Sequence, residues 1–428
     1  MLKLYFWIFN FRMKNYSAFL IILIFFICSC NTTHQESINV KKSNFLTGFW
    51  LGKLEIKPGK YLPFNFEITE DSIFFVNGQE KISGLISKSA DSIFNIKMPV
   101  FNSEFNFKLI EDKLEGDWVN QAKGPEYVIP FYASKSKNIN NRFYSPNSLS
   151  SSSISGKWEV DFAYNSSDKY KAIGVFEHEK NNLTGTFITE TGDYRYLQGN
   201  SINDSVFLSC FDGSHAFLFE AKLENEELNG VFYSGKHYQN RWKAHRNSSF
   251  LLSNPDSITK INTELPISFS FPDLDSNIVS FPSSRFNNKV LIVQIIGSWC
   301  PNCLDETAFF NSLHKKYNSA GLEVISLAFE QSNVFSEKVK SVKRLKDHFK
   351  ADYPFLIAGN AGKKDVELSL PFLMNVASFP TTLYIDRNGT IRKVHSGFYG
   401  PGTGEFYSNF SSETSQLIEQ LLQEKPLN

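Results

Sequence analysis

The chain has 428 residues, with 44 Lys and Arg against 44 Asp and Glu, so it is long enough for two or three domains with hydrophobic cores. A formal net charge of zero, without a basic stripe interleaved with aromatic residues, argues against nucleic acid as a partner. Five cysteines are too few for a scaffold held by disulfides, and a content of 15% aromatic residues favours β-structure.

The first 30 residues have the pattern of an export signal. Basic residues precede an apolar run, Ala18 to Cys28, whose length fits the ~7–15 residues of a signal core and falls short of the ~18 needed to span a bilayer. The run ends in Ser29-Cys30, which resembles the lipobox of bacterial lipoproteins. The resemblance implies that residues 1–30 are a lipoprotein signal peptide ending at a lipidated Cys30, and residues 31–45 a polar tether. An ordinary export signal with an incidental cysteine is the alternative.

The middle of the chain contains one unit twice, in residues 46–134 and 154–247. The matched segments are 46–50 with 154–158, 91–94 with 204–207 and 114–116 with 228–230. Each copy has about eight short β-forming stretches separated by Gly, Asn and Asp, and few segments show helical spacing. This pattern predicts an antiparallel meander that closes into a small barrel or a sandwich, and the Ser- and Asn-rich residues 135–153 are interpreted as a linker.

Neither copy shows a catalytic constellation. The histidines of the second copy lack the spacing of a metal-binding pair and are interpreted as structural or surface residues: His178, His215, His237 and His245. Cys210 is interpreted as a buried small hydrophobic residue, and the equivalent Trp50 and Trp158 as core anchors. An apolar ligand inside a barrel remains an open alternative.

The pattern changes to that of an α/β domain at residues 255–425. Val290–Ile296 is a nearly continuous apolar run, which is typical of a strand buried on both faces of a sheet. The segment Trp299-Cys300-Pro301-Asn302-Cys303 follows it and precedes apolar residues at helical spacing. Further along we expect a strand at 322–327, helices at 335–349, 365–373 and 417–422, and a hairpin at 382–394.

The CxxC motif at the start of a helix points to thiol chemistry. Two intervening residues place both sulfurs within disulfide reach, and the helix dipole at its exposed N-terminal end favours the thiolate of Cys300. Cys300 is therefore the expected nucleophile, and Cys303, one turn inward and shielded, would resolve the mixed disulfide. A zinc site is disfavoured because no second CxxC or Cys/His pair lies nearby.

This arrangement resembles the thioredoxin superfamily, and more closely its TlpA/ResA-like branch of membrane-tethered extracytoplasmic thiol–disulfide oxidoreductases. The resemblance covers residues 266–422 and leaves out the repeats. It is carried by the CxxC segment 299–303, Glu306, Phe379-Pro380-Thr381-Thr382 and the turn Ile385–Gly389. It implies a multidomain chain: two β-rich repeats followed by an α/β thioredoxin-like domain.

The same resemblance assigns further site residues. Pro380 matches the family's cis-proline, which packs against the CxxC, so Trp299, Phe379 and Pro380 are expected to contact the substrate. Glu306 matches an acidic residue of this branch and could exchange a proton with Cys303. A solvated carboxylate on the helix surface is the alternative for Glu306. The family more often has Pro where this chain has Asn302.

The resemblance implies an enzyme without cofactor or metal that reduces disulfides of exported proteins. It would be lipid-anchored to a bacterial membrane in the periplasmic cell envelope, with a membrane thiol reductase as its electron donor. A peroxiredoxin-like peroxidase is one alternative, although Gly297 stands where that family has Thr. A binding lipoprotein with an ancillary thioredoxin domain is another. A basic run is interpreted as a solvated helix face: Lys338, Lys340, Lys343, Arg344, Lys346 and Lys350.

Overall fold

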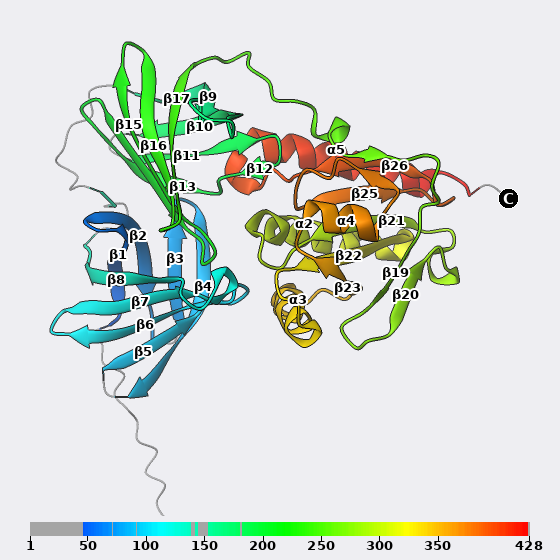
Figure 1. Cartoon of the computed structure of the whole chain (residues 1–428), viewed down its shortest axis with the longest axis horizontal. Coiled ribbons are helices and arrows are strands. Elements are labelled where there is room, and N and C mark those ends of the chain that lie inside the picture. Colours follow the sequence, from blue (N-terminus) through cyan, green and yellow to red (C-terminus); the bar gives the residue numbers. More distant parts are fainter. Residues whose placement is uncertain are drawn as a thin grey trace, which may run out of the picture. The chain divides into compact units, whose positions relative to one another are not determined.

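The computed structural model describes residues 46–70, 72–90, 92–137, 142–143, 153–179 and 182–426. The predicted signal peptide, its Cys30 and the tether lie outside the described residues. Two antiparallel β-barrels precede an α/β domain in the described chain (Figure 1). This order confirms the predicted fold class. From Leu46 onward the chain forms one compact unit.

The first copy of the repeat is a closed antiparallel barrel whose strands follow one another in chain order. They are β1 (Gly48–Lys57), β2 (Lys60–Ile68), β3 (Ser72–Asn77), β4 (Glu80–Ala90), β5 (Ile93–Lys97), β6 (Ser103–Ile110), β7 (Lys113–Asn120) and β8 (Val128–Lys135), with a 3-10 turn, η1 (Gln121–Lys123). Trp50, Leu54 and Ile56 are buried on one face of β1 while Phe49 and Lys53 are exposed. This two-residue period is what a half-buried strand requires.

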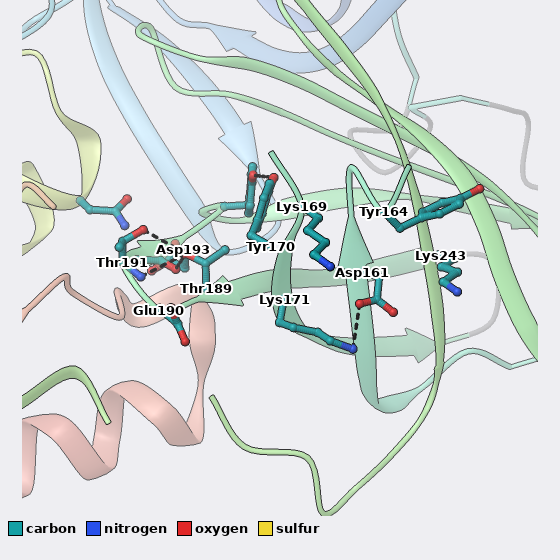
Figure 2. A pocket seen from close by; sticks show the side chains of 13 residues that line it. Asp161, Tyr164, Lys169, Tyr170, Lys171, Thr189, Glu190, Thr191, Asp193 and Lys243 are labelled. Carbon is teal, nitrogen blue, oxygen red and sulfur yellow. Dashed lines mark hydrogen bonds and ion pairs between the residues drawn. The ribbon is translucent and has the colours of Figure 1, made fainter. Parts of the chain in front are cut away.

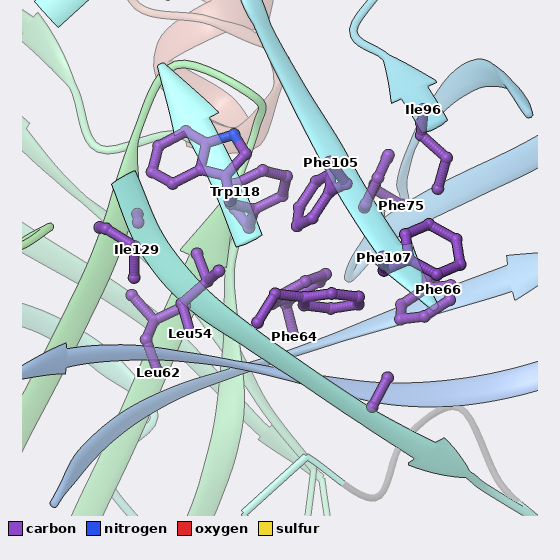
Figure 3. Packing of buried hydrophobic residues seen from close by; sticks show 14 of the residues in the cluster. Leu54, Leu62, Phe64, Phe66, Phe75, Ile96, Phe105, Phe107, Trp118 and Ile129 are labelled. Carbon is purple, nitrogen blue, oxygen red and sulfur yellow. The ribbon is translucent and has the colours of Figure 1, made fainter. Parts of the chain in front are cut away.

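Aromatic rings fill the interior of the first barrel. Figure 3 shows Phe64, Phe75 and Phe105 gathered between the strands, with ring centroids 6.0 Å apart for Phe64–Phe105 and 5.5 Å for Phe75–Phe105. Trp118 packs against Phe105 at 6.5 Å. The high Phe content of the sequence therefore supplies the barrel core, because closing eight strands leaves just enough interior for side chains.

The second copy forms the same kind of barrel. Its strands are β9 (Gly156–Phe162), β10 (Tyr170–Glu179), β11 (Asn182–Thr189), β12 (Gly192–Asp193), β13 (Leu197–Ile202), β14 (Ser205–Phe211), β15 (Ala216–Glu224), β16 (Glu227–Ser234) and β17 (Tyr238–Arg246). The pairing of β10 with β11 closes the ring, and the two-residue β12 is added beside β11. The two copies thus adopt one β-rich fold, which confirms the duplication prediction.

Equivalent tryptophans anchor both barrels. The Trp50 Nε1 donates a hydrogen bond to the Leu46 carbonyl at 2.8 Å, and the Trp158 Nε1 donates to the Ile154 carbonyl at 2.9 Å. Both side chains are fully buried. Each ring therefore packs at the same position of its barrel, with its Nε1 hydrogen-bonded. The interpretation as core anchors is confirmed. Cys210 is also fully buried, as expected.

The matched glycines Gly116 and Gly230 are positions where we expect an added side chain to destabilise the barrel. A Cβ at Gly116 would lie 2.0 Å from the Asn106 carbonyl oxygen, and one at Gly230 would lie 2.2 Å from the Glu220 carbonyl oxygen. We expect Gly116→Ala and Gly230→Ala each to destabilise its barrel by about 3 kcal/mol, because backbone has to move.

Thermal denaturation followed by near-ultraviolet circular dichroism checks this expectation. Gly59→Ala is the control, because Gly59 has open space around it and only a positive φ of 72° to strain an added side chain, which costs ~1 kcal/mol. Equal losses of stability at all three glycines would show that the close backbone contacts at Gly116 and Gly230 are not the cause.

The α/β domain is built on a five-stranded sheet in the order β23-β22-β21-β25-β26. The strands are β21 (Val290–Ile296), β22 (Leu322–Glu330), β23 (Phe355–Asn360), β25 (Thr381–Ile385) and β26 (Ile391–Ser396), with short pairs β18 (Lys260–Ile261) with β24 (Leu373–Met374) and β19 (Phe269–Pro272) with β20 (Ile278–Phe281). β21, β22 and β23 run parallel, whereas β25 is antiparallel to both β21 and β26.

Helices cover both faces of this sheet. They are α2 (Pro301–Tyr317), α3 (Phe335–Phe349), α4 (Lys363–Ser369) and α5 (Glu405–Gln423), with 3-10 turns η2 (Pro255–Ser257), η3 (Ser284–Phe286), η4 (Asn318–Ala320) and η5 (Pro401–Thr403). Ile292 of β21 packs in one core with α2, α3 and α5, and Val293 in the opposite core with α4. Every residue of β21 is buried, which explains its continuous apolar sequence.

Most elements of this domain were predicted, but β23 and two short strand pairs were not. The predicted strand 290–296 and helix 335–349 are confirmed with the same bounds, and the predicted short helix is α4. The sequence carries no clear signal for β23, the β19–β20 hairpin or the β18–β24 pair, because short apolar stretches flanked by loops have no distinctive period. Within the part of the chain that the structure describes, no helix combines the length and apolarity needed to cross a bilayer.

Candidate active site

Cys300 is the N-cap residue of α2, and Pro301 is its first helical residue. The Cys300 Sγ accepts a hydrogen bond from the Cys303 backbone N–H at 3.4 Å. Both cysteines carry free thiols. Proline suits this first helical position because its missing N–H would have no partner inside the helix. The sulfur of Cys300 thus lies at the positive end of the helix dipole, where negative charge is favoured.

Both thiols are more enclosed than the sequence indicated. Cys300 is only 8% exposed, so the expectation of an exposed nucleophile is wrong, while Cys303 is fully buried as predicted. The Cys300 Sγ lies 3.4 Å from the Phe379 carbonyl oxygen, and the second barrel reaches the same segment, since the Ser214 Oγ donates to the Trp299 carbonyl at 3.3 Å. Burial, together with the neighbouring Cys300, raises the pKa of Cys303 well above its ordinary value.

The three predicted substrate-contact residues lie around Cys300. The Phe379–Pro380 peptide bond is cis, and the Pro380 carbonyl accepts from the Gly397 N–H at 2.8 Å. The Trp299 and Phe379 rings meet edge to face, with centroids 5.4 Å apart at 71°. The Trp299 Nε1 donates to the Phe329 carbonyl at 3.0 Å. Segments 80 residues apart in the sequence therefore form one surface beside the nucleophile.

Glu306 lies inside the domain. Its side chain is fully buried, and its two oxygens accept hydrogen bonds from the Thr382 Oγ1 at 2.6 Å and the Gln294 Nε2 at 2.8 Å. The alternative of a solvated helix-surface carboxylate is therefore wrong. Burial raises the pKa of Glu306 from about 4.5 to about 7, against the two hydrogen bonds that favour the ionised form. The Glu306 charge in turn contributes to the raised pKa of Cys303.

A second buried carboxylate, Glu330, was not predicted. It ends β22 and is 3% exposed. Its oxygens accept from the Ser298 N–H at 2.8 Å and the Ser298 Oγ at 2.7 Å. Burial raises the pKa of Glu330 to about 7. The expected strand ended at Leu327, so Glu330 was not placed at the carboxyl edge of the sheet, beside the loop that leads to Cys300.

Arg195 of the second barrel was also missed, and it joins all three parts of the chain. The guanidinium is 3% exposed and forms ion pairs with Glu80 of β4 and Asp305 of α2. Its Nη1 donates to the Pro301 carbonyl at 3.1 Å, and its Nε lies 3.8 Å from Asp212. We call Arg195, Glu80, Asp212 and Asp305 the Arg195 cluster.

Asp212 of the Arg195 cluster is ionised. Burial opposes its charge, but His215 and Arg195 lower the pKa of Asp212 to about 2. Its carboxylate also accepts from the backbone N–H groups of Ser214, at 2.8 Å, and His215, at 2.6 Å. The cluster therefore places a fixed cation among carboxylates within hydrogen-bonding reach of the CxxC helix.

The residues just before Arg195 lie against the CxxC segment and the loop at Gly400. The Asp193 carboxylate accepts from the Gly400 N–H at 2.6 Å. A Cβ on Gly192 would lie 2.0 Å from the Asn302 side chain. Asn302 and the second barrel line a cavity of about 930 Å³, whose walls carry Lys169, Lys171 and Asp161 (Figure 2). The second barrel thus contacts the motif directly.

Within the described ranges, no group of three or more His, Cys, Asp or Glu side chains is arranged to hold a metal ion. His178 lies on β10 opposite Leu183 and is half-buried, and His215 pairs with Asp212. The predicted lipidation residue, Cys30, lies outside the described residues and has no structural account.

A buried parallel strand, a CxxC at the start of the following helix and a cis-proline loop beside its first sulfur define a thioredoxin-like domain. The Redoxin family profile matches residues 260–405, so this part of the chain is a Redoxin domain. A similar protein is thiol-disulfide oxidoreductase ResA of Geobacillus kaustophilus (strain HTA426), 28% identical over 114 residues. That match takes in 27% of this chain and spans 58% of the relative's length.

Two further comparisons show the range of similar proteins. Chloroplastic peroxiredoxin Q of Suaeda salsa is 28% identical over 139 residues, which cover 32% of this chain and 60% of the relative. The crystal structure of a putative thiol:disulfide interchange protein DsbE from Chlorobium tepidum is 20% identical and covers 36% of this chain and 93% of that one, with a TM-score of 0.28. All of these matches leave most of the chain without a counterpart.

Proposed function

We propose that this chain is a thiol–disulfide oxidoreductase that reduces protein disulfides through Cys300 and Cys303. The observation that carries the proposal is the pair of free thiols at the start of α2, with the Cys300 sulfur 3.4 Å from the cis-proline loop. The resemblance of the domain to ResA supports it. Trp299, Phe379 and Pro380 would hold the substrate chain beside the sulfur.

The reaction balances over two exchanges. The Cys300 thiolate attacks one substrate sulfur, the substrate S–S bond breaks, and a mixed disulfide forms while the first substrate thiolate leaves. The Cys303 thiol then loses its proton and attacks the Cys300 sulfur, which releases the second substrate thiolate and leaves a Cys300–Cys303 disulfide. Two electrons pass to the substrate.

Glu306 would accept the proton of Cys303 in the second exchange. The thiol is fully buried, so its deprotonation needs a base inside the protein. Glu306 is the buried carboxylate whose charge acts on Cys303, and a pKa of about 7 lets it change protonation state near neutral pH. Thr382 and Gln294 hold both of its oxygens in place.

Replacing Glu306 with glutamine should remove a pH dependence of stability. Because the pKa is about 7 in the folded chain and near 4.5 when unfolded, the folded state retains a proton between these values that the unfolded state releases. The free energy of unfolding therefore falls as pH rises through this window, by about 3 kcal/mol in total. Glu306→Gln should flatten that fall and slow the second exchange.

Denaturation at pH 5 and pH 8, and the rate of mixed-disulfide resolution, measure the two effects. Glu413→Gln on the exposed face of α5 is the control and should leave both unchanged. An unaltered pH slope in Glu306→Gln would show that this carboxyl does not titrate in that window.

Trapping tests the proposed function itself. In Cys303→Ser the second exchange cannot occur, so a mixed disulfide between Cys300 and a substrate protein should accumulate and be released by dithiothreitol. Equilibration of the unmodified protein with glutathione gives the reduction potential. A potential near the ~−120 mV of strong oxidants would reverse the direction proposed here, and failure of the thiols to pair in any redox buffer would refute the couple.

The proposed location is the bacterial cell envelope, with lipid on Cys30 and disulfides of exported proteins as substrates. The apolar run before Ser29-Cys30 supports an anchor. A reductase in an oxidising compartment needs electrons, which a membrane thiol reductase would supply.

Cys30→Ser should therefore move the protein from the membrane fraction to the soluble fraction. Cys28→Ser is the matched control and should stay with the membrane. Mass spectrometry of the mature N-terminus checks the processing site, and a terminus elsewhere would rule out the lipoprotein assignment.

A thiol peroxidase is the second candidate, because peroxiredoxin Q is among the similar proteins. Gly297 stands three residues before Cys300, where peroxiredoxins carry Thr. Consumption of hydrogen peroxide by the reduced protein, at a rate above its disulfide reduction, would favour this candidate.

A further inference from the structure

A cleft of about 760 Å³ lies next to the CxxC segment, and all three parts of the chain line it. Trp299 and Glu330 come from the thioredoxin-like domain, Phe217 from the second barrel and Asn120 from the first. Because Trp299 directly precedes Cys300, a substrate held in this cleft lies next to the segment that carries the nucleophile. The volume falls within the ~300–1,000 Å³ of ligand clefts, so the cleft fits a chain segment and not a folded domain.

The walls of the cleft are fixed to one another by specific contacts. The Arg195 cluster links the two barrels to α2. The Arg344 Nε donates to the Val100 carbonyl of the first barrel at 3.2 Å. Between the barrels, a Cβ on Gly213 would lie 2.4 Å from Met98. Such close approaches need complementary surfaces, so the cleft is a built feature of the chain.

Three cations line the cleft, and none of them is within 4.0 Å of a carboxylate among the residues that the structure describes: Lys123, Lys338 and Arg344. The Lys338 Nζ donates to the Gly359 carbonyl at 3.0 Å and to the Asn360 Oδ1 at 2.6 Å. The Lys123 Nζ lies 5.2 Å from the centre of the Tyr127 ring. The interpretation of the basic run on α3 as wholly solvated is wrong for Lys338, which is only 8% exposed.

Two carboxylates, Glu330 and Glu337, face the same space and offset part of the charge of the three cations. Glu330 is buried and bonded to Ser298, and Glu337 is exposed on α3. His215 pairs with Asp212, while burial lowers the pKa of His237, which keeps it neutral at pH 7. The balance of the lining is therefore cationic, which favours an anionic ligand.

The remaining lining suits an extended polypeptide. Aromatic rings form the wall that the second barrel contributes: Tyr170, Tyr194, Phe217, Phe232 and Tyr238. Amide side chains, which both donate and accept hydrogen bonds, also line the cleft: Asn102, Asn120, Gln121 and Gln331. Asn120 is 1% exposed, and its Oδ1 accepts no hydrogen bond from the described residues. A peptide brings both apolar side chains and backbone N–H groups to such a surface.

We propose that this cleft binds an extended, acidic polypeptide segment and presents the disulfide next to it to Cys300. The proposal rests on the proposed function and names its substrate class. The two barrels are then recognition domains, since the cleft exists only where they meet the thioredoxin-like domain.

Competition between two cystine peptides tests this assignment. Both carry the same disulfide, with three Glu beside it in one and three Lys in the other, and the second-order rate constant for reduction by the reduced full chain is measured for each. We expect the acidic peptide to react at least 10-fold faster at low salt, and the ratio to shrink as ionic strength rises. Lys123→Glu should reduce the ratio to below 1.

Lys113→Glu is the matched control, because Lys113 is an exposed lysine at the start of β7 that does not line the cleft. It should keep the ratio of the unmodified protein. A neutral disulfide, bis(2-hydroxyethyl) disulfide, should react at equal rates with the unmodified protein and with Lys113→Glu. If the unmodified protein does not reduce the neutral disulfide, the thiol–disulfide function is refuted. If it does, but reduces both peptides at equal rates, only the cleft assignment is refuted. Faster reduction of glutathione disulfide than of either peptide would make the occupant a small anionic disulfide and overturn the polypeptide assignment.

Discussion

Cys300→Ser should lower the rate of disulfide reduction at least ~1,000-fold, which corresponds to about 4 kcal/mol of lost transition-state stabilisation. A serine hydroxyl stays protonated at neutral pH and cannot form the mixed disulfide, whereas the thiol at the start of α2 has the helix dipole to stabilise its anion. The rate of reduction of a cystine peptide by the reduced protein measures the effect.

The matched control is Cys210→Ala. Cys210 is a free, fully buried thiol in β14 of the second barrel, so its removal should leave the rate within about twofold while costing some stability. Full disulfide-reductase activity in Cys300→Ser would require the catalytic assignment to be abandoned in favour of a binding lipoprotein.

Arg195→Met should lower the free energy of unfolding by about 3–5 kcal/mol. The substitution removes the cation but leaves Glu80, Asp212 and Asp305 close together, with Asp212 only 1% exposed, and an unpaired buried charge is costly. It should also loosen the contact between the second barrel and α2, because Arg195 bonds both Asp305 and the Pro301 carbonyl.

Thermal denaturation and limited proteolysis report these two effects. Lys222→Met is the control on the same barrel, since Lys222 pairs with Glu224 on the surface and should cost less than ~0.5 kcal/mol. Restored stability in an Arg195→Met, Asp305→Asn double variant would indicate that the unpaired carboxylate, and not lost packing, is the cause. If Arg195→Met unfolds and is cleaved like the unmodified protein, the Arg195 cluster does not hold the parts together.

The predictable parts of the site are those encoded within a few residues of one another. The CxxC of Cys300 and Cys303 follows an apolar run in the sequence, which predicted a buried strand and then a helix that begins at the motif. The structure confirms both elements. The motif around Pro380 resembles that of the family's cis-proline, and the Phe379–Pro380 peptide bond is cis in the structure. The sequence identified Glu306 as a site residue, but its buried position beside Thr382 and Gln294 of the sheet could not be predicted.

The sequence alone determined the duplicated β-rich units, the α/β pattern and the thiol pair, because periodicity, repetition and short spacing are local properties. Only the tertiary structure decided how enclosed Cys300 is, that Glu330 holds the preceding loop, and that Arg195 meets Glu80 and Asp305. Those partners lie 115 and 110 residues from Arg195 along the chain, and Lys123 and Lys338 come together in one cleft from different domains. Contacts of this range leave no period or motif in a single sequence, since they arise when separately folded surfaces pack together.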